Sequence, residues 1–89
     1  MVESKLEISN RLGLHARAAA KLVHTAGSFS SQVTLVTEGE EVDAKSILGI
    51  LQLGAAQGME VAIRCEGGDE AEALEAVTRL FYDRFGEDQ

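Results

Sequence analysis

The stretch GLHARAAAKLVHTAG, residues 13–27, decides the fold of this chain, because it contains the pattern of a helix that follows a strand-like segment after a loop over residues 10–14. The part from Ala16 to Ala26 is rich in alanine and other strong helix formers. Gly27 stands where a glycine that ends a helix is expected. Helical spacing places one set of apolar side chains on a single face, which we expect to pack on a sheet: Ala18, Ala19, Leu22, Val23 and Ala26.

Four further segments have the pattern of strands. Residues 2–9 alternate between charged and less polar side chains, and residues 60–65 alternate again with Val61, Ile63 and Cys65 on one face. Residues 33–37 are rich in β-branched side chains. A turn at Glu38 and Gly39 leads from this strand into a short partner strand over residues 40–43.

Two more helices are predicted. Ser46 can cap a short helix over residues 47–53, which Gly54 ends. Asp69 followed by Glu72 resembles a capping box at the start of the last helix. Its expected core stripe consists of Ala73, Leu74, Val77, Leu80 and Phe81.

The order strand, helix, strand, strand, helix, strand, helix predicts an α+β fold. We expect an open-faced two-layer sandwich, with a four-stranded antiparallel sheet covered on one face by three helices. A chain of 89 residues indicates one domain, residues 1–89, whose core is too small for a deep active site. Chemistry is therefore expected at the surface, on a loop or at a helix end.

We expect a cytoplasmic protein without a membrane-inserted segment, and a monomer. The chain has no long apolar run, and residues 1–10 lack the apolar centre of a signal peptide. Cys65 is the only cysteine, which excludes a disulfide within the chain. His15, His24 and Cys65 do not have the spacing of a common zinc site, so we expect neither a metal nor another cofactor.

The net charge of −7 argues against nucleic acid as a partner. The charge is uneven, since the chain is net positive before Thr25 and strongly negative after Gly58. A basic N-terminal region could steer a negatively charged partner or ligand. The alternative is a solvated surface that serves only solubility.

His15 is the first candidate for chemistry, because it stands at or beside the N-cap of the first predicted helix. The first N–H groups of that helix, including those of Ala16 and Arg17, have no acceptor within the helix. Together with the helix dipole they favour an anion and disfavour an imidazolium, which keeps the ring nucleophilic. A phosphoryl group on His15 would find these donors and the guanidinium of Arg17. The alternative is that His15 is only a polar cap.

Two motifs carry a family resemblance. The run Gly13-Leu14-His15-Ala16-Arg17-Ala18-Ala19 resembles the active-site motif of the HPr family, the histidine-containing phosphocarriers of the bacterial phosphoenolpyruvate-dependent phosphotransferase system. The run Lys45-Ser46-Ile47-Leu48-Gly49-Ile50-Leu51, with Leu53-Gly54, resembles the second signature of that family. The resemblance spans essentially the whole chain.

The resemblance implies roles for single residues. His15 would be phosphorylated on Nδ1, Arg17 would contact the phosphoryl group, and Ser46 would be a regulatory serine that a dedicated kinase phosphorylates in some bacteria. Partners would dock on an exposed apolar patch and on the outer face of the first helix, whose cationic charge, with that of Lys45, suits acidic partners. The expected docking residues are Ala16, Ala20, Lys21, His24, Ile47, Leu48 and Leu51.

The implied activity is that of a carrier and not of an enzyme. The donor would be Enzyme I, and the acceptors would be Enzyme IIA domains in sugar uptake or in regulation. Two alternatives stay open: a regulatory docking module controlled at His15 or Ser46 that feeds no transporter, and a domain that binds a small anion without a covalent bond. Many family members have proline where this chain has Ala18, so we expect slower transfer or a looser active-site turn.

Overall fold

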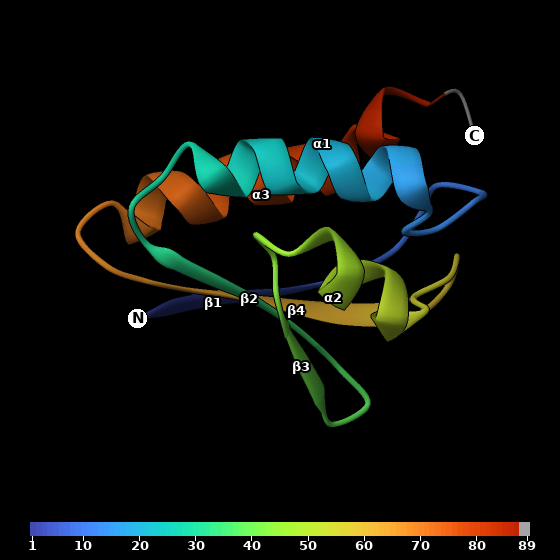
Figure 1. The fold of residues 1–89 in the computed structure, drawn as a ribbon, viewed down its shortest axis with the longest axis horizontal. Helices are drawn as coiled ribbons and strands as arrows, with labels where there is room; N and C mark the ends of the chain where they lie inside the picture. Colours follow the sequence, from blue (N-terminus) through green and yellow to red (C-terminus); the bar gives the residue numbers. More distant parts are fainter. Residues whose placement is uncertain (88–89) are drawn as a thin grey trace.

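Three helices cover one face of a four-stranded antiparallel sheet in the computed structural model of the protein, which describes residues 1–87 (Figure 1). The strand order is β1-β4-β2-β3. The elements are β1 (Val2–Glu7), α1 (Ala16–Gly27), β2 (Gln32–Thr37), β3 (Glu40–Asp43), α2 (Ile47–Leu53), β4 (Glu60–Glu66), α3 (Glu70–Tyr82) and a 3-10 turn, η1 (Arg84–Gly86). The predicted open-faced α+β sandwich is confirmed, and η1 is an element that the sequence analysis did not predict.

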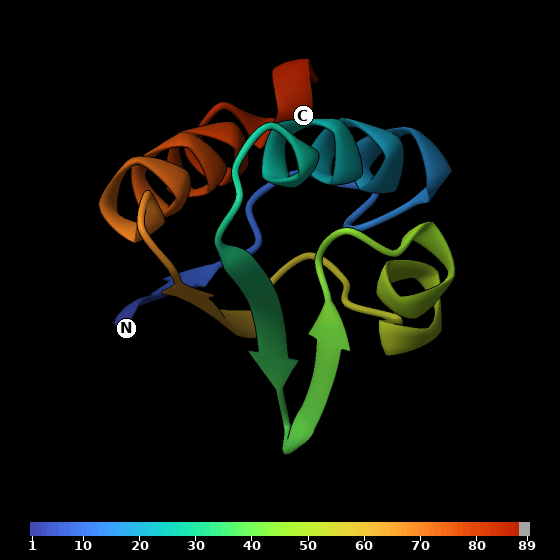
Figure 2. The ribbon, with the colours of Figure 1, turned by 60° about the vertical axis from the view of Figure 1, so that its left-hand side comes forward.

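The core lies between the sheet and the helices (Figure 2). The two-residue alternation of β2 and β4 turns Val33, Leu35, Val61, Ile63 and Cys65 inward, and all five are fully buried. Burial, with the nearby negative charges of Glu70 and Asp69 at the start of α3, raises the pKa of the Cys65 thiol. The predicted inner faces of α1 and α3 are buried or packed against this core.

The prediction for the end of α1 is wrong. Gly27 is the last residue of the helix, and the C-cap is Ser28 in an ordinary right-handed conformation with φ −73°. The N–H groups of Ser28 and Phe29 donate to the carbonyl oxygens of Thr25 and Ala26, each at 3.2 Å. Because the last turn closes by these bonds, the helix needs no left-handed glycine.

The predicted capping box at the start of α3 is also wrong. Asp69 is the N-cap, but its side chain makes no capping hydrogen bond. Its carboxylate accepts the backbone N–H groups of Ser30 and Ser31, both at 2.9 Å, and the hydroxyl of Ser31. These hydrogen bonds lower the pKa of Asp69 to about 2. Asp69 therefore ties the start of α3 to the loop between α1 and β2.

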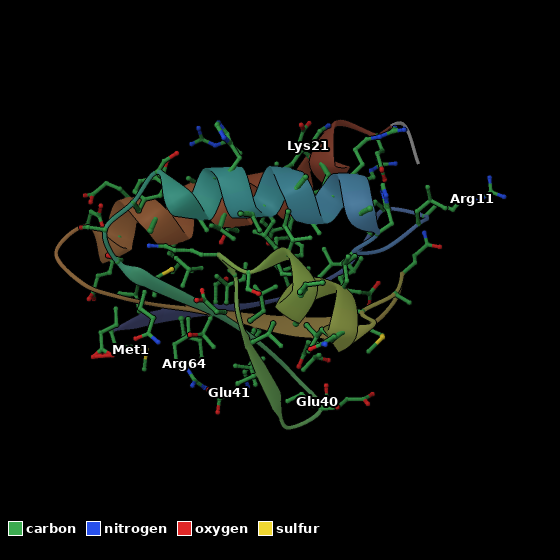
Figure 3. The ribbon with its side chains drawn as sticks, in the orientation of Figure 1. Met1, Arg11, Lys21, Glu40, Glu41 and Arg64 are labelled. Atoms are coloured by element: carbon green, nitrogen blue, oxygen red, sulfur yellow. The ribbon has the colours of Figure 1, made fainter. Side chains whose placement is uncertain are left out.

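The predicted caps of α2 are confirmed. The Ser46 hydroxyl accepts the N–H of Gly49 at 3.1 Å, and Gly54 ends the helix with φ +64°. On the open face of the sheet, Arg64 of β4 pairs with Glu3 at 3.1 Å and with Glu41 at 3.2 Å (Figure 3). Within residues 1–87, no helix has the length and apolar character needed to span a membrane.

Candidate functional site

His15 is the N-cap of α1, as the sequence predicts. Its backbone is extended, with φ −78° and ψ 179°, and its carbonyl oxygen accepts the N–H of Ala19 at 2.8 Å. Its ring atom Nδ1 accepts the backbone N–H of Arg17 at 3.3 Å. The lone pair of Nδ1 is therefore directed at the first turn of α1, whose N–H groups have no acceptor within the helix and favour an anion.

The loop before His15 is fixed against the segment that follows α2. Gly13 has φ +64°, a conformation that suits glycine, and a Cβ at this position would lie 2.6 Å from the carbonyl oxygen of Ala55. The next residue, Leu14, is buried and donates its N–H to the same oxygen at 3.0 Å. These contacts fix the backbone immediately before His15 and place α2 near the start of α1.

The second ring nitrogen of His15 contacts a carboxylate from the far end of the chain. His15 Nε2 hydrogen-bonds Glu87 Oε2, and Asn10 Nδ2 donates to Glu87 Oε1 at 3.0 Å. Burial would raise the pKa of Glu87, but the hydrogen bonds from Asn10 and His15 and the positive charge of Arg17 outweigh it and lower the pKa. Glu87 is therefore held as a carboxylate against the ring.

The turn η1 places Glu87 over His15. Phe85 is buried although its φ is +57°, and Lys21 Nζ of α1 donates to its carbonyl oxygen at 2.5 Å (Figure 3). A bulky residue adopts a positive φ only where its surroundings hold it there. Burial of the Phe85 ring and the bond from Lys21 supply that support.

Sequence analysis missed Asn10 and Glu87. Glu87 is 72 residues from His15, and no spacing pattern connects them. Asn10 is completely buried, and its Nδ2 also donates to the carbonyl oxygen of Gly13 at 2.7 Å. The helix end alone therefore does not set the environment of His15, because a carboxylate faces the other side of the ring.

The predicted docking residues of α1 all lie on its exposed face, together with Arg17: Ala16, Ala20, Lys21 and His24. Lys45 does not add to the positive charge beside His15. Its Nζ donates to the carbonyl oxygen of Phe29 at 2.8 Å, just beyond the opposite end of α1. The expectation of a local cationic group that includes Lys45 is therefore corrected to Arg17 and Lys21.

An apolar patch of Ile47, Leu48 and Leu51 is exposed on α2, with Leu48 71% exposed. The views in Figures 1 and 2 place α2 alongside the first half of α1. Within residues 1–87, no three His, Cys, Asp or Glu side chains are grouped closely enough to bind a metal ion. The site thus combines a ring nitrogen, free N–H groups, a guanidinium and an apolar docking surface, which suits reversible attachment of a phosphoryl group at the surface.

Comparison with known proteins gives consistent matches over the whole chain. A family model described as "PTS HPr component phosphorylation site" matches residues 2–83. Phosphocarrier protein HPr of Xylella fastidiosa is 51% identical over 88 residues, which cover 99% of each chain. The crystal structure of HPr from Thermoanaerobacter tengcongensis matches with a TM-score of 0.97 and 47% identity over 100% of both chains. A crystal structure of an HPr dimer from the same organism matches with a TM-score of 0.79 and 48% identity over 98% of this chain and 100% of that one.

Proposed function

The chain belongs to the HPr family of phosphocarriers of the phosphotransferase system, and on that premise we propose that it accepts a phosphoryl group on His15 from Enzyme I and passes it to Enzyme IIA domains. It acts as a stoichiometric carrier, as one domain of residues 1–89 and without a cofactor. The observation that carries the proposal is the position of the His15 ring at the N-cap of α1, with Nδ1 facing the N–H of Arg17.

Nδ1 is the proposed attachment site. A phosphoryl group bound there takes the place of Nδ1 as the acceptor of the N–H of Arg17, and its charge lies at the positive end of α1. The exposed guanidinium of Arg17 reaches the same phosphoryl oxygens and forms charge-assisted hydrogen bonds. The loop packing through Gly13 and Leu14 holds this geometry without a deep pocket.

The partners dock on the surfaces that flank His15. The apolar patch of Ile47, Leu48 and Leu51 supplies buried contact area, and Arg17 and Lys21 complement an acidic rim. Ala16 and Ala20 allow close approach, and His24 lies at the edge of this surface. A carrier must release its partners, which fits a small and transient interface in the cytoplasm. We propose that the chain acts as a monomer, although the relative from Thermoanaerobacter tengcongensis also occurs as a dimer.

Ser46 has a structural role, and we propose a regulatory one as well. Its hydroxyl caps α2 through Gly49, so Ser46→Ala should lower the free energy of unfolding by about 1 kcal/mol. A phosphate on Ser46 would lie beside the apolar patch and repel an acidic partner. An HPr serine kinase with ATP should modify the wild type and leave Ser46→Ala unmodified. Modification of both proteins, or of neither, would contradict the regulatory role.

The deciding experiment is phosphorylation by Enzyme I and phosphoenolpyruvate, measured by intact mass on the wild type and on His15→Ala. We expect one acid-labile phosphoryl group on the wild type and none on the variant. A wild type that a competent donor leaves unmodified would overturn the carrier function. In that case a regulatory docking module would become the leading function.

A further inference from the structure

We propose that Glu87 is a positioning residue for His15: its carboxylate keeps the ring proton on Nε2 and so leaves the lone pair on Nδ1, facing the start of α1. This inference rests on the proposed function, because it concerns the nitrogen that receives the phosphoryl group. Glu87 itself touches neither the phosphoryl group nor the donor, and it acts only through the ring.

The contacts of the ring specify one tautomer. Nε2 faces a carboxylate oxygen, which can only accept a hydrogen bond, and Nδ1 faces the N–H of Arg17, which can only donate one. The neutral ring satisfies both contacts only when the proton is on Nε2. A proton on Nδ1 would leave the carboxylate without its donor and would face the Arg17 N–H with a second N–H.

Asn10 holds the second oxygen of the Glu87 carboxylate, while His15 contacts the first. Asn10 is completely buried, and its Nδ2 group donates both to Glu87 Oε1 at 3.0 Å and to the carbonyl oxygen of Gly13 at 2.7 Å. Both partners of Nδ2 are acceptors, which fixes the orientation of the Asn10 amide. Glu87 is only 13% exposed, so water competes weakly for its oxygens. The positive charge of Arg17 in α1 also acts on this carboxylate and favours its ionised form.

The same arrangement assists the transfer step. As Nδ1 attacks, a bond forms between Nδ1 and phosphorus, the bond between phosphorus and the donor atom of Enzyme I breaks, and its electron pair stays on the donor. The proton on Nε2 does not move. Positive charge develops on the ring, and the Glu87 carboxylate stabilises it, as the carboxylate of a Ser-His-Asp triad does for its histidine.

The amide variant distinguishes control of the tautomer from a packing role. If Glu87 served only packing, Glu87→Gln would have a smaller effect than Glu87→Ala, whereas control of the tautomer predicts a larger one. In Glu87→Gln, the amide oxygen is held by Asn10 Nδ2, because turning Asn10 over would sacrifice its 2.7 Å bond to Gly13. The amide NH2 then faces His15 Nε2 and favours the wrong tautomer, with the proton on Nδ1. Glu87→Ala removes the carboxylate without imposing this tautomer, since the Arg17 N–H still favours the correct one.

The test measures the tautomer and the transfer rate on the wild type, Glu87→Ala and Glu87→Gln. Glu40→Gln is the control with the same change of charge, because Glu40 is an exposed residue at the start of β3, in the hairpin that points away from α1 (Figure 3). Long-range nitrogen–proton NMR spectra, recorded where the chemical shifts indicate a neutral ring, report the protonated nitrogen of His15. We expect the proton on Nε2 in the wild type and in the control, a mixture in Glu87→Ala, and a shift toward Nδ1 in Glu87→Gln.

The rate of phosphorylation by Enzyme I should fall in the order wild type, Glu87→Ala, Glu87→Gln, with a loss on the order of tenfold or more for the glutamine variant. Identical tautomers in all four proteins, or a glutamine variant as fast as the wild type, would overturn the role of Glu87. The NMR measurement needs no phosphoryl donor. A wild type that Enzyme I fails to phosphorylate would therefore overturn the proposed function, while the spectra still decide the role of Glu87.

Discussion

The Phe85 ring meets the Phe81 ring edge-on, with centroids 4.9 Å apart and planes inclined at 67°. Phe81 belongs to the buried face of α3, so this contact joins the C-terminal turn to the main core. Aromatic pairs of this geometry favour each other beyond simple area burial. The pair holds η1 in place and thereby carries Glu87 to the ring of His15.

Phe85→Ala should lower the free energy of unfolding by about 3 kcal/mol or more, because it removes a fully buried aromatic ring. Urea denaturation measures this loss. Tyr82→Ala is the matched control, since Tyr82 is a neighbouring aromatic residue that is 72% exposed, and it should change stability by less than about 0.5 kcal/mol. Equal losses in the two variants would show that Phe85 does not anchor the turn.

Gly13→Ala should destabilise the protein by about 2 kcal/mol or more, because it combines a left-handed backbone with a clash against the Ala55 carbonyl oxygen. It should also slow phosphorylation, since His15 follows two residues later. Gly39 also has a positive φ, +84°, but the new Cβ of Gly39→Ala would meet open space, so this variant should cost only about 1 kcal/mol. A control that loses as much stability as Gly13→Ala would exclude a role for the contact with Ala55.

Asp69→Asn should change how stability depends on pH. The folded-state pKa of Asp69 is about 2, below its ordinary value of 3.8, so its contribution is present above about pH 4 and is lost as the pH falls toward 2. The variant should be less stable than the wild type at pH 5, and this difference should shrink toward pH 2. Urea midpoints across this range measure it, with Asp83→Asn as the control for charge. A difference that stays constant with pH would contradict the link to Ser30 and Ser31.

Ala18→Pro should raise the rate of phosphoryl transfer. Ala19 makes the first backbone hydrogen bond of α1, to His15, so the N–H of Ala18 lies before the regular helix bonds and its loss costs little. The proline ring would restrict φ in the turn that carries His15 and Arg17. Single-turnover phosphorylation by Enzyme I measures the rate, and an unchanged or lower rate would contradict the prediction.

The local pattern of the chain was enough to predict the architecture and the main reactive group. Two-residue alternation indicated the strands, and the spacing of alanine and leucine in residues 16–26 predicted which face of α1 is buried, because both depend only on neighbouring residues. The capping roles of His15 and Ser46 follow from their positions at helix starts. The run of residues around His15 was also enough to indicate the HPr family.

Only the tertiary structure decided where distant side chains meet. Asp69 has the local signature of a cap, yet the loop at Ser30 and Ser31 offers its carboxylate better donors. Lys45 looks like part of the cationic site in sequence, but its amine lies at the other end of α1. Glu87 reaches His15 because Phe85 is buried against Phe81, and no local pattern encodes a contact across 72 residues. Helices and strands form from neighbouring residues, whereas the second side of the His15 ring is set by packing of the whole chain.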